Sequence, residues 1–333
     1  MNENGFSLYR LKLKGLERRK PIKEKIVRKS ESDFLGNGEI KMELSSLQSA
    51  FEKTVDACHN VVKASYPYLM EALGDGLGAG LYVLGGTSGS GKTTFATNLA
   101  LRTAELGTPV LVYSLEMTTG NLVSKMLSRT AFLRSEFQIR KSMTDIQRKH
   151  FTEDEWQAFK DCTAEVWKLP IDIEDSTTLG CPSVDAIRDD CKEKIRKCRE
   201  QGSTPLVIID YLQYVALGQT AEQRTAIDYA VKVFKTISAQ EQVPVWVLSS
   251  VNRNAYGKDP SMSDFKESGG IEFTADVCMI LNTEGDGKAI PHRNSAFRDV
   301  TLHILKNRFG MSGTEIGYYY FPKENEYEEV SIR

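Results

Sequence analysis

Apolar and polar positions along this chain follow two different periods, and the change from one period to the other delimits the elements. From Gly80 onward, short apolar runs rich in β-branched residues alternate with longer stretches whose apolar residues recur at helical spacing. The short runs predict strands over residues 81–84, 109–114, 170–174, 205–210, 244–250, 275–281, 300–306 and 313–321. The longer stretches predict helices over residues 92–105, 120–132, 153–167, 184–199 and 221–240.

Strands that alternate with helices in this way are typical of a parallel sheet whose two faces are both covered by helices. We therefore predict an α/β fold with a mostly parallel central sheet flanked by helices and with antiparallel strands near the C-terminus. The chain has 333 residues, which is enough for one large or two ordinary domains.

The segment that precedes this alternation has a different character. Residues 1–41 hold eleven Lys and Arg against six Asp and Glu, a net charge of +5, and show little periodicity, so we expect a poorly ordered basic arm. Residues 42–63 carry apolar side chains at helical spacing, which predicts an amphipathic helix that packs on its own domain or on a neighbouring subunit. Those apolar positions are Leu47, Phe51, Val55, Cys58 and Val62.

Overall composition narrows the class of protein without pointing to one function. Hydrophobic residues make up 41% and charged residues 26%, which is ordinary for a soluble globular protein, and a net charge of −2 argues against attraction of the whole molecule to nucleic acid. No apolar run is long enough to span a bilayer, and the N-terminus has no signal-peptide core. The six cysteines form no C-x-x-C pair and the four histidines have no ligand-like spacing, so we expect a reduced, cytoplasmic protein without structural zinc.

The strongest chemical signal lies between the first predicted strand and the helix that follows it. Residues 86–94 read G-T-S-G-S-G-K-T-T directly after the apolar run L-Y-V-L, which is the context of the G-x-x-x-x-G-K-T phosphate loop. Glycines let successive backbone N–H groups face a polyphosphate, and the helix N-terminus adds partial positive charge. We expect Lys92 to reach the β- and γ-phosphates and the Thr93 hydroxyl to hold Mg²⁺. The predicted nucleotide-binding residues are Gly86, Thr87, Ser88, Gly89, Ser90, Gly91, Lys92, Thr93 and Thr94.

Two acidic residues at strand ends extend this prediction. Asp210 ends the apolar run L-V-I-I-D, and a strand end at this point places a carboxylate beside the magnesium ion and its waters. Glu116 stands in S-L-E-M after the strand at 109–114, where it would orient or deprotonate the attacking water. The alternative for Glu116 is a helix-entry glutamate that interacts with the helix dipole, and position alone favours neither.

Two polar segments nearer the C-terminus carry further candidates. The segment D-F-K-E-S-G-G at 264–270 follows V-N-R-N at 251–254 and could present Lys266 and backbone N–H groups to a phosphodiester chain, although a solvated connection explains the same residues. The segment K-N-R-F-G at 306–310 places two cations at alternate positions of a strand end. These cations either complete an active site across a subunit boundary, as an arginine finger does, or form an ordinary charged strand exit.

Taken together, these segments resemble the motor domain of DnaB-type replicative helicases, within the larger RecA-like group. The matching segments lie in family order over roughly residues 75–325: G-T-S-G-S-G-K-T-T-F-A-T-N-L-A, Y-S-L-E-M, V-I-I-D-Y-L-Q-Y, L-S-S-V-N-R, S-D-F-K-E-S-G-G-I-E-F-T-A-D and L-K-N-R-F-G. The resemblance implies a RecA-like ATPase core over residues 76–333, preceded by a linker-type helix within 42–75. It also implies ATP and Mg²⁺ bound between subunits of a ring, usually a homo-hexamer, with hydrolysis coupled to movement along single-stranded DNA in replication.

The resemblance also gives roles to individual residues. Arg308, with Lys306 beside it, is similar to the finger that reaches the γ-phosphate of the neighbouring subunit. Glu116 and Lys92 match the other catalytic positions of the family, and Thr93 and Asp210 match the positions at the metal. The implied DNA-binding residues are Arg253, Lys266, Glu267 and Gly269.

The chain departs from the family pattern in three places. The strand at 244–250 ends in Ser249-Ser250 where the family has Ser-Gln, and serine has no amide with which to couple the phosphate state to the DNA loops. Phe309 replaces a polar residue. A basic arm and one predicted helix stand where the family has a helical N-terminal domain, so we expect that domain to be missing, and primase binding and collar formation do not carry over.

Three functions follow from these matches and departures. The first is an ATP-dependent DNA helicase of DnaB type. The second is a RecA-like, DNA-stimulated ATPase that acts as a loader or switch without unwinding. The third is an inactive scaffold, which the presence of Lys92, Thr93, Glu116, Asp210 and Arg308 disfavours.

Overall fold

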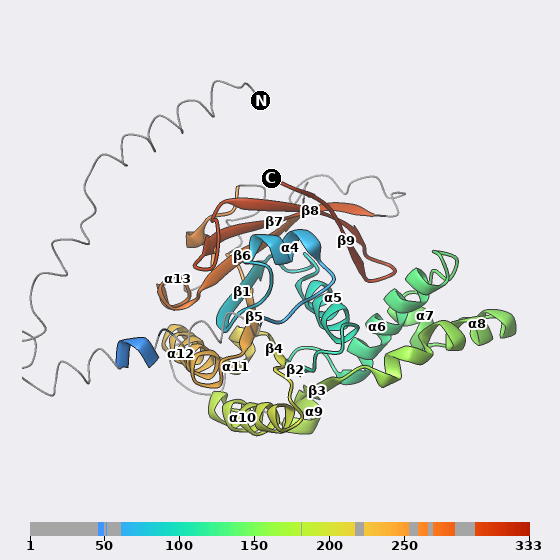
Figure 1. Cartoon of the computed structure of the whole chain (residues 1–333). Coiled ribbons are helices and arrows are strands. Elements are labelled where there is room, and N and C mark those ends of the chain that lie inside the picture. Colours follow the sequence, from blue (N-terminus) through green and yellow to red (C-terminus); the bar gives the residue numbers. More distant parts are fainter. Residues whose placement is uncertain are drawn as a thin grey trace, which may run out of the picture. The chain divides into compact units, whose positions relative to one another are not determined.

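The computed structural model describes residues 46–49, 51, 61–180, 182–216, 223–252, 259–265, 269–283 and 297–333. The chain divides into two units, Met1–Asp56 and Ala57–Arg333, and the second unit contains the fold (Figure 1). In the first unit, residues 46–49 and 51 are helical, with Leu47 and Phe51 exposed. The predicted basic arm at 1–41 lies outside the described residues.

The helix predicted over 42–63 does not reach its predicted end. Val62 instead forms an antiparallel bridge with Leu77 and is buried in the core of the second unit. The short helix α4 (Pro67–Ala72) follows, and its first-turn N–H groups at Tyr68 and Leu69 donate to the carboxylate of Glu329. At Val62, the last apolar position of the predicted pattern, the side chain is therefore buried beside a bridge and not in a helix.

A single nine-stranded sheet runs through the second unit, in the order β3-β2-β4-β5-β1-β6-β7-β8-β9. The first six strands are parallel: β1 (Gly80–Gly86), β2 (Val110–Ser114), β3 (Ile171–Asp175), β4 (Leu206–Asp210), β5 (Pro244–Ser250) and β6 (Val277–Thr283). The last three are antiparallel: β7 (Arg298–Asn307), β8 (Thr314–Phe321) and β9 (Glu326–Ile332). The predicted α/β class with antiparallel C-terminal strands is confirmed, although the prediction stopped at residue 321 and missed β9.

Helices cover both faces of the sheet. One face carries α5 (Lys92–Ala104), and the other carries α10 (Val184–Glu200) and α12 (Gln223–Glu241) (Figure 1). A smaller group on the α5 side consists of α6 (Thr119–Arg134), α7 (Met143–Gln147), α8 (Glu153–Thr163) and the 3₁₀ turn Ala164–Lys168, around a core of its own. The remaining short elements are α9 (Ser176–Leu179), α11 (Leu212–Ala216), the 3₁₀ turn Met262–Asp264 and α13 (Gly269–Thr274). No helix within the described ranges is long and apolar enough to cross a membrane.

The two faces of β1 feed two separate cores. Tyr82 and Leu84 point to the α5 side, whereas Leu81 and Val83 point to the α10 and α12 side, as the two-residue period of a strand requires. β1 is apolar and buried on both faces, and it is the fifth of the nine strands, between β5 and β6. The loop that follows its last residue, Gly86, therefore starts from a strand that is buried and paired on both sides.

Candidate active site

The phosphate loop spans the gap between β1 and α5, and its glycines are needed for both backbone shape and space. Gly89 and Gly91 have positive φ angles of 80° and 90°, a region in which residues with a Cβ are strained. A Cβ on Gly91 would lie 2.3 Å from the Tyr327 hydroxyl, so a larger residue could not enter without moving that side chain. The loop is closed by hydrogen bonds from Ser90 to the carbonyl oxygen of Thr87, at 3.2 Å from the amide and 2.9 Å from the hydroxyl.

Lys92 lies at the first position of α5 and folds back over this loop. Its Nζ donates to the carbonyl oxygens of Gly86 (2.8 Å) and Thr87 (2.9 Å). Burial lowers the pKa of Lys92, while the nearby carboxylates of Asp210 and Glu116 act to raise it. The ammonium group is thus held at the mouth of the loop, where a phosphate would replace the backbone acceptors.

Asp210 ends β4 beside β2 and is 3% exposed. Burial raises the pKa of this carboxyl to about 6, and a hydrogen bond with Thr93 opposes the rise. Its Oδ2 atom is buried and has no hydrogen-bond partner among the described residues. A buried carboxylate oxygen without a partner, next to a threonine hydroxyl, fits Mg²⁺, which takes one or two protein oxygens and completes its shell with phosphate and water.

Glu116 is exposed two residues beyond β2, and the turn that carries it is fixed from three sides. Ser114 Oγ donates to the Met117 carbonyl (2.7 Å), and the Leu115 N–H donates to the Asp210 carbonyl (2.6 Å). The N–H of Thr119 donates to the buried Asp175 carboxylate at 2.6 Å. The charge of Glu116 influences the pKa of both Lys92 and Asp210. The structure therefore brings three predicted groups, at positions 92, 116 and 210, to one edge of the sheet.

Lys125 on α6 belongs to the same edge and was missed by the sequence analysis. Its Nζ donates to the Thr94 hydroxyl (3.0 Å) and to the Asn325 side-chain oxygen (2.9 Å). Burial lowers the pKa of Lys125, and the charge of Asp210 opposes that shift. The signal available in the sequence was a single lysine in a helix between the buried residues Leu122 and Met126, which a surface lysine also produces.

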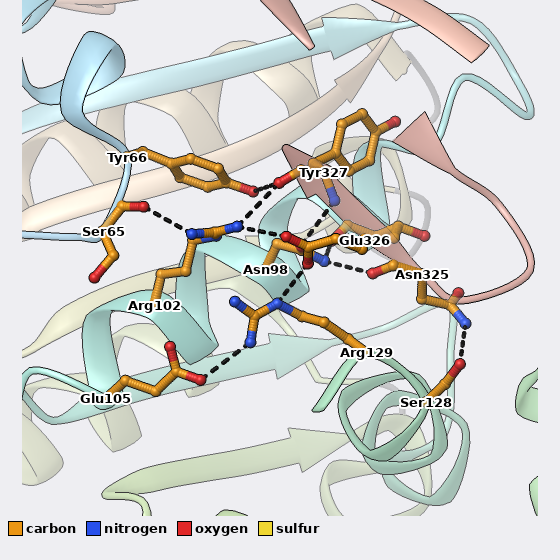
Figure 2. A network of polar contacts seen from close by, with 11 residues as sticks. Ser65, Tyr66, Asn98, Arg102, Glu105, Ser128, Arg129, Asn325, Glu326 and Tyr327 are labelled. Atoms are coloured by element: carbon orange, nitrogen blue, oxygen red, sulfur yellow. Dashed lines mark hydrogen bonds and ion pairs between the residues drawn. The ribbon is translucent and has the colours of Figure 1, made fainter. Parts of the chain in front are cut away.

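The β8–β9 hairpin supports this edge from behind α5 (Figure 2). Asn98 of α5 donates to the Asn325 carbonyl (2.8 Å) and accepts from the Tyr327 N–H (3.1 Å). The buried Glu326 carboxylate pairs with Arg102 of α5 and with Arg129 of α6, the latter at 2.6 Å (Figure 2). One carboxylate from the missed strand β9 therefore joins the helix after the phosphate loop to the helix after Glu116.

Tyr327 connects the same hairpin to the phosphate loop itself. Its hydroxyl donates to the Ser90 carbonyl at 2.9 Å, and its ring stacks on Tyr320 with 4.3 Å between the ring centroids. The loop is consequently braced by side chains that lie more than two hundred positions later in the chain.

Arg308 and Lys306 lie at the opposite edge of the sheet. The Arg308 N–H donates to the Asp276 carbonyl, and the Asp276 N–H donates to the carbonyl of Leu81 at the start of β1. Leu81 lies six positions before Thr87, the first residue after β1, which amounts to roughly 20 Å at about 3.3 Å per residue. Lys306 Nζ donates to the backbone carbonyls of Glu272 (2.6 Å) and Ala275 (2.7 Å). Neither cation can reach the phosphate loop of its own chain.

The predicted DNA-binding residues are mostly outside the described part of the chain. Arg253, Lys266 and Glu267 fall in its gaps, whereas Gly269 is the first residue of α13. The described stretches around them start from the end of β5, where Ser250 pairs with Gly86 and Val251 bridges to Phe265. The segment that holds these residues therefore leaves the sheet next to the phosphate loop.

Comparisons with known proteins agree with this arrangement. A family model described as the DnaB-like helicase C terminal domain matches residues 63–329. The chain is 31% identical over 242 residues to the replicative DNA helicase DnaB of Buchnera aphidicola subsp. Schizaphis graminum, covering 70% of this chain and 48% of that protein. It is 26% identical over 208 residues to the replicative DNA helicase DnaB of Mycobacterium intracellulare, covering 58% of this chain and 34% of that protein. The chain thus spans a third to a half of the length of these curated relatives.

Solved structures support the fold. One solved ATPase domain superposes with a TM-score of 0.72 at 21% identity, covering 89% of this chain and all of that one. A DnaB-like replicative helicase, solved in a study of its interactions with primase, gives a TM-score of 0.71 at 20% identity, covering 98% of this chain and 76% of that one. A KaiC-like protein of Pyrococcus horikoshii gives a lower TM-score of 0.54. Because the family model matches most of this chain, residues 63–329, the chain belongs to the family of DnaB-like helicase C-terminal domains.

Proposed function

We propose that this chain is an ATP-dependent DNA helicase of DnaB type that moves along single-stranded DNA in replication as a ring of identical copies, with six as the family's usual number. The observation that carries the proposal is the separation of the two halves of the site. Lys92, Thr93 and Asp210 lie at one edge of the sheet, whereas Arg308 is exposed at the other edge, about 20 Å away along β1. A site divided in this way is completed by a second copy placed head to tail, and such contacts form a ring when the rotation between copies closes.

Each residue of the phosphate edge has a distinct task in this proposal. Lys92 exchanges the carbonyls of Gly86 and Thr87 for phosphate oxygens, and the backbone N–H groups of the loop bind the remaining oxygens. Thr93 and Asp210 would hold Mg²⁺, which neutralises charge on the phosphates when bound. Glu116 orients the attacking water and accepts its proton. ATP and Mg²⁺ are thus the substrate and the metal that these side chains suit.

The opposite edge supplies the remaining charge. Arg308 presents a planar guanidinium with five N–H donors, which suits the oxygens of a transferring phosphoryl group. Lys306 lies two positions earlier in β7 and adds a second cation to the same surface. We assign Arg308 to the γ-phosphate bound by the neighbouring copy, with Lys306 supporting it.

Movement along DNA requires that ATP binding and hydrolysis change the position of the segments that bind the DNA strand. Arg253, Lys266, Glu267 and Gly269 are the proposed DNA-binding residues. The backbone that leads to them begins at Ser250, which pairs with Gly86 at the start of the phosphate loop. A change at the loop can therefore pass through the Gly86–Ser250 pairing to Arg253, which follows three positions after Ser250.

A second function, a DNA-stimulated ATPase that loads or switches without unwinding, is favoured by one observation. The Ser250 N–H donates to the Gln213 side chain (3.1 Å), and Gln213 also donates to the Ser249 hydroxyl (3.0 Å), so the strand end is tied to α11. Serine at 250 is too short to reach from this strand end toward a bound phosphate. A strand-displacement assay separates the two functions, because hydrolysis that rises with DNA without displacement supports the second.

The proposed function is tested by ATP turnover with and without single-stranded DNA at low salt, where phosphate contacts are strongest. We expect turnover to rise with DNA and to fall by on the order of 10²–10³-fold in Lys92→Ala, because the variant loses the cation at the phosphates. The oligomeric state with a non-hydrolysable ATP analogue should show a closed ring. Turnover that ignores DNA, or a chain that stays monomeric with nucleotide and DNA together, contradicts the proposal.

A further inference from the structure

The turn that carries Arg308 is attached to the start of β1 through an aromatic contact. The ring of Phe309 lies on Tyr82, with 5.7 Å between the ring centroids. A Cβ placed on Gly80 would lie 2.5 Å from the Phe309 Cζ atom, which is closer than real Cβ contacts allow. The absence of a side chain at Gly80 therefore creates the space that the Phe309 ring occupies.

A second attachment holds the turn from its other side. The buried side chain of Asn307 donates to the Ala72 carbonyl at the end of α4 (2.8 Å) and accepts from the Phe309 N–H (3.0 Å). Gly310 passes so close that an added Cβ would lie 2.8 Å from the same Ala72 oxygen. Residues on both sides of Arg308 are thus fixed to the body of the chain.

Arg308 itself is held in a way that leaves its side chain able to move. Its guanidinium pairs with Asp276 Oδ1 at 3.0 Å, and the Arg308 side chain is 49% exposed. The Asp276 carboxylate also accepts from the Leu81 N–H (2.7 Å) and from Lys235 (2.6 Å). If Arg308 swings away, the buried carboxylate keeps two donors, so the movement does not leave an unpaired buried charge.

We propose that Phe309 is a positioning residue for Arg308: its ring, seated on Tyr82 in the space left by Gly80, fixes the point from which the guanidinium enters the neighbouring copy's phosphate site. This inference rests on the proposed function, in which Arg308 acts on the ATP of another copy. Because the backbone is fixed on both sides of Arg308, the guanidinium can reach only a limited set of positions. A misplacement of about 1 Å at a reacting centre costs on the order of 100-fold in rate.

The first test compares variants on the two sides of the aromatic contact. Phe309→Asn removes the ring, and Gly80→Ala fills its space, so both should lower kcat by on the order of 10- to 100-fold with little change in the KM for ATP. Gly80→Ala should add little further in a Phe309→Ala background, because the ring it displaces is already gone and only a 3.3 Å approach to Asp276 Oδ2 remains. Met311→Ser is the matched control, since Met311 is in the same turn and the residue is 79% exposed. It should retain activity within about twofold, as surface substitutions usually do.

The second test separates positioning from simple destabilisation. The Phe309→Asn variant keeps an intact phosphate loop, and the Lys92→Ala variant keeps an intact Arg308 surface. In an equal mixture of the two, some sites therefore combine the loop of the first variant with the Arg308 surface of the second. Random head-to-tail assembly makes about a quarter of the sites of this kind, and we expect recovery to about a quarter of the wild-type rate. A variant whose own phosphate edge was damaged could not be rescued in this way.

The outcomes distinguish the two proposals. Rescue of both Arg308→Ala and Phe309→Asn by Lys92→Ala is the expected result. Rescue of Arg308→Ala alone, or an unchanged kcat in Phe309→Asn and Gly80→Ala, overturns the role of Phe309 and leaves the proposed function standing. Failure to rescue Arg308→Ala contradicts action between copies and overturns both.

Discussion

The two edges of the central sheet differ in how their polar groups are satisfied. At the phosphate edge, Lys92 is folded onto backbone carbonyls, and a buried oxygen of Asp210 lacks a partner among the described residues. At the opposite edge, Arg308 already has an ion pair, and its carboxylate partner Asp276 has further donors. The phosphate edge therefore has a buried polar atom that a ligand would satisfy. At the opposite edge the charged groups are already paired, and Arg308 is exposed to solvent.

Under the proposed function, this difference lets one chain hold both halves of the active site without using them together. Parallel strands bring the residues after β1, β2 and β4 to the same edge, whereas the antiparallel strand β7 returns the chain to the other edge before Arg308. The length of β1 keeps the two halves about 20 Å apart. Under the proposed function, the topology of the sheet therefore makes catalysis depend on assembly.

The largest expected effect comes from the opposite edge. Arg308→Ala should lower kcat by on the order of 10³-fold or more, the usual worth of an arginine finger. The affinity of the dilute single chain for ATP should stay within about threefold, because Arg308 is about 20 Å from its own phosphate loop. Turnover assays and titration calorimetry give the two quantities. Arg308→Lys keeps the charge but not the planar fork and should fall in between. If the single Arg308→Ala chain lost ATP affinity by as large a factor as kcat, Arg308 would act on the nucleotide of its own chain, which contradicts the separation of the two edges.

The next effect concerns the support behind the phosphate edge. Glu326→Gln leaves the guanidiniums of Arg102 and Arg129 without their buried carboxylate and should lower the free energy of unfolding by about 3–5 kcal/mol. Glu328→Gln on the same strand is the control, because Glu328 is exposed and its loss should change stability by less than about 0.5 kcal/mol. Denaturant unfolding compares them. Equal, small decreases in the free energy of unfolding of both variants would mean that the ion pairs of Glu326 with Arg102 and Arg129 do not stabilise this edge.

The smallest expected effect concerns the buried carboxyl of Asp210 and the pH dependence of stability. Burial raises the pKa of Asp210 from 3.8 to about 6, so between these values the folded chain binds more protons than the unfolded chain. The free energy of unfolding without nucleotide therefore falls as pH rises from about 4 to about 6 and then levels off. Asp210→Asn removes this loss, and at pH 8 the variant should be more stable than wild type by about 1–3 kcal/mol, with little difference near pH 4. A difference that does not depend on pH would contradict this origin.

The sequence predicted the parts of the site whose residues are close together in the chain. The phosphate loop, the position of Asp210 at the end of an apolar run and the ranges of the parallel strands each follow from a local pattern. Strand β9 was missed because its residues, E-Y-E-E-V-S-I, offer little apolar alternation, and its burial depends on curling over α5. The error at Val62 has the same cause, since its apolar side chain is buried by a bridge to Leu77.

Residues that act through long-range contacts could not be read from local patterns. Lys125 acquires its place from Thr94 and Asn325, and Glu326 from Arg102 and Arg129. A lysine or a glutamate in a helix or strand is by default a solvated side chain, so its burial becomes visible only in the folded chain. The opposite placement of Arg308 also depends on topology, because the direction of β7 relative to β1 decides which edge it occupies.

The contact between Tyr327 and Ser90 has a consequence for biosynthesis. The two residues are separated by 237 positions, so the loop emerges from the ribosome long before the side chain that braces it. Synthesis at about 5–20 residues per second leaves the nascent loop without its aromatic support for at least ten seconds or so. Under the proposed function, the nucleotide-binding loop therefore gains its aromatic support late in translation, after the β8–β9 hairpin has been made and has packed on α5.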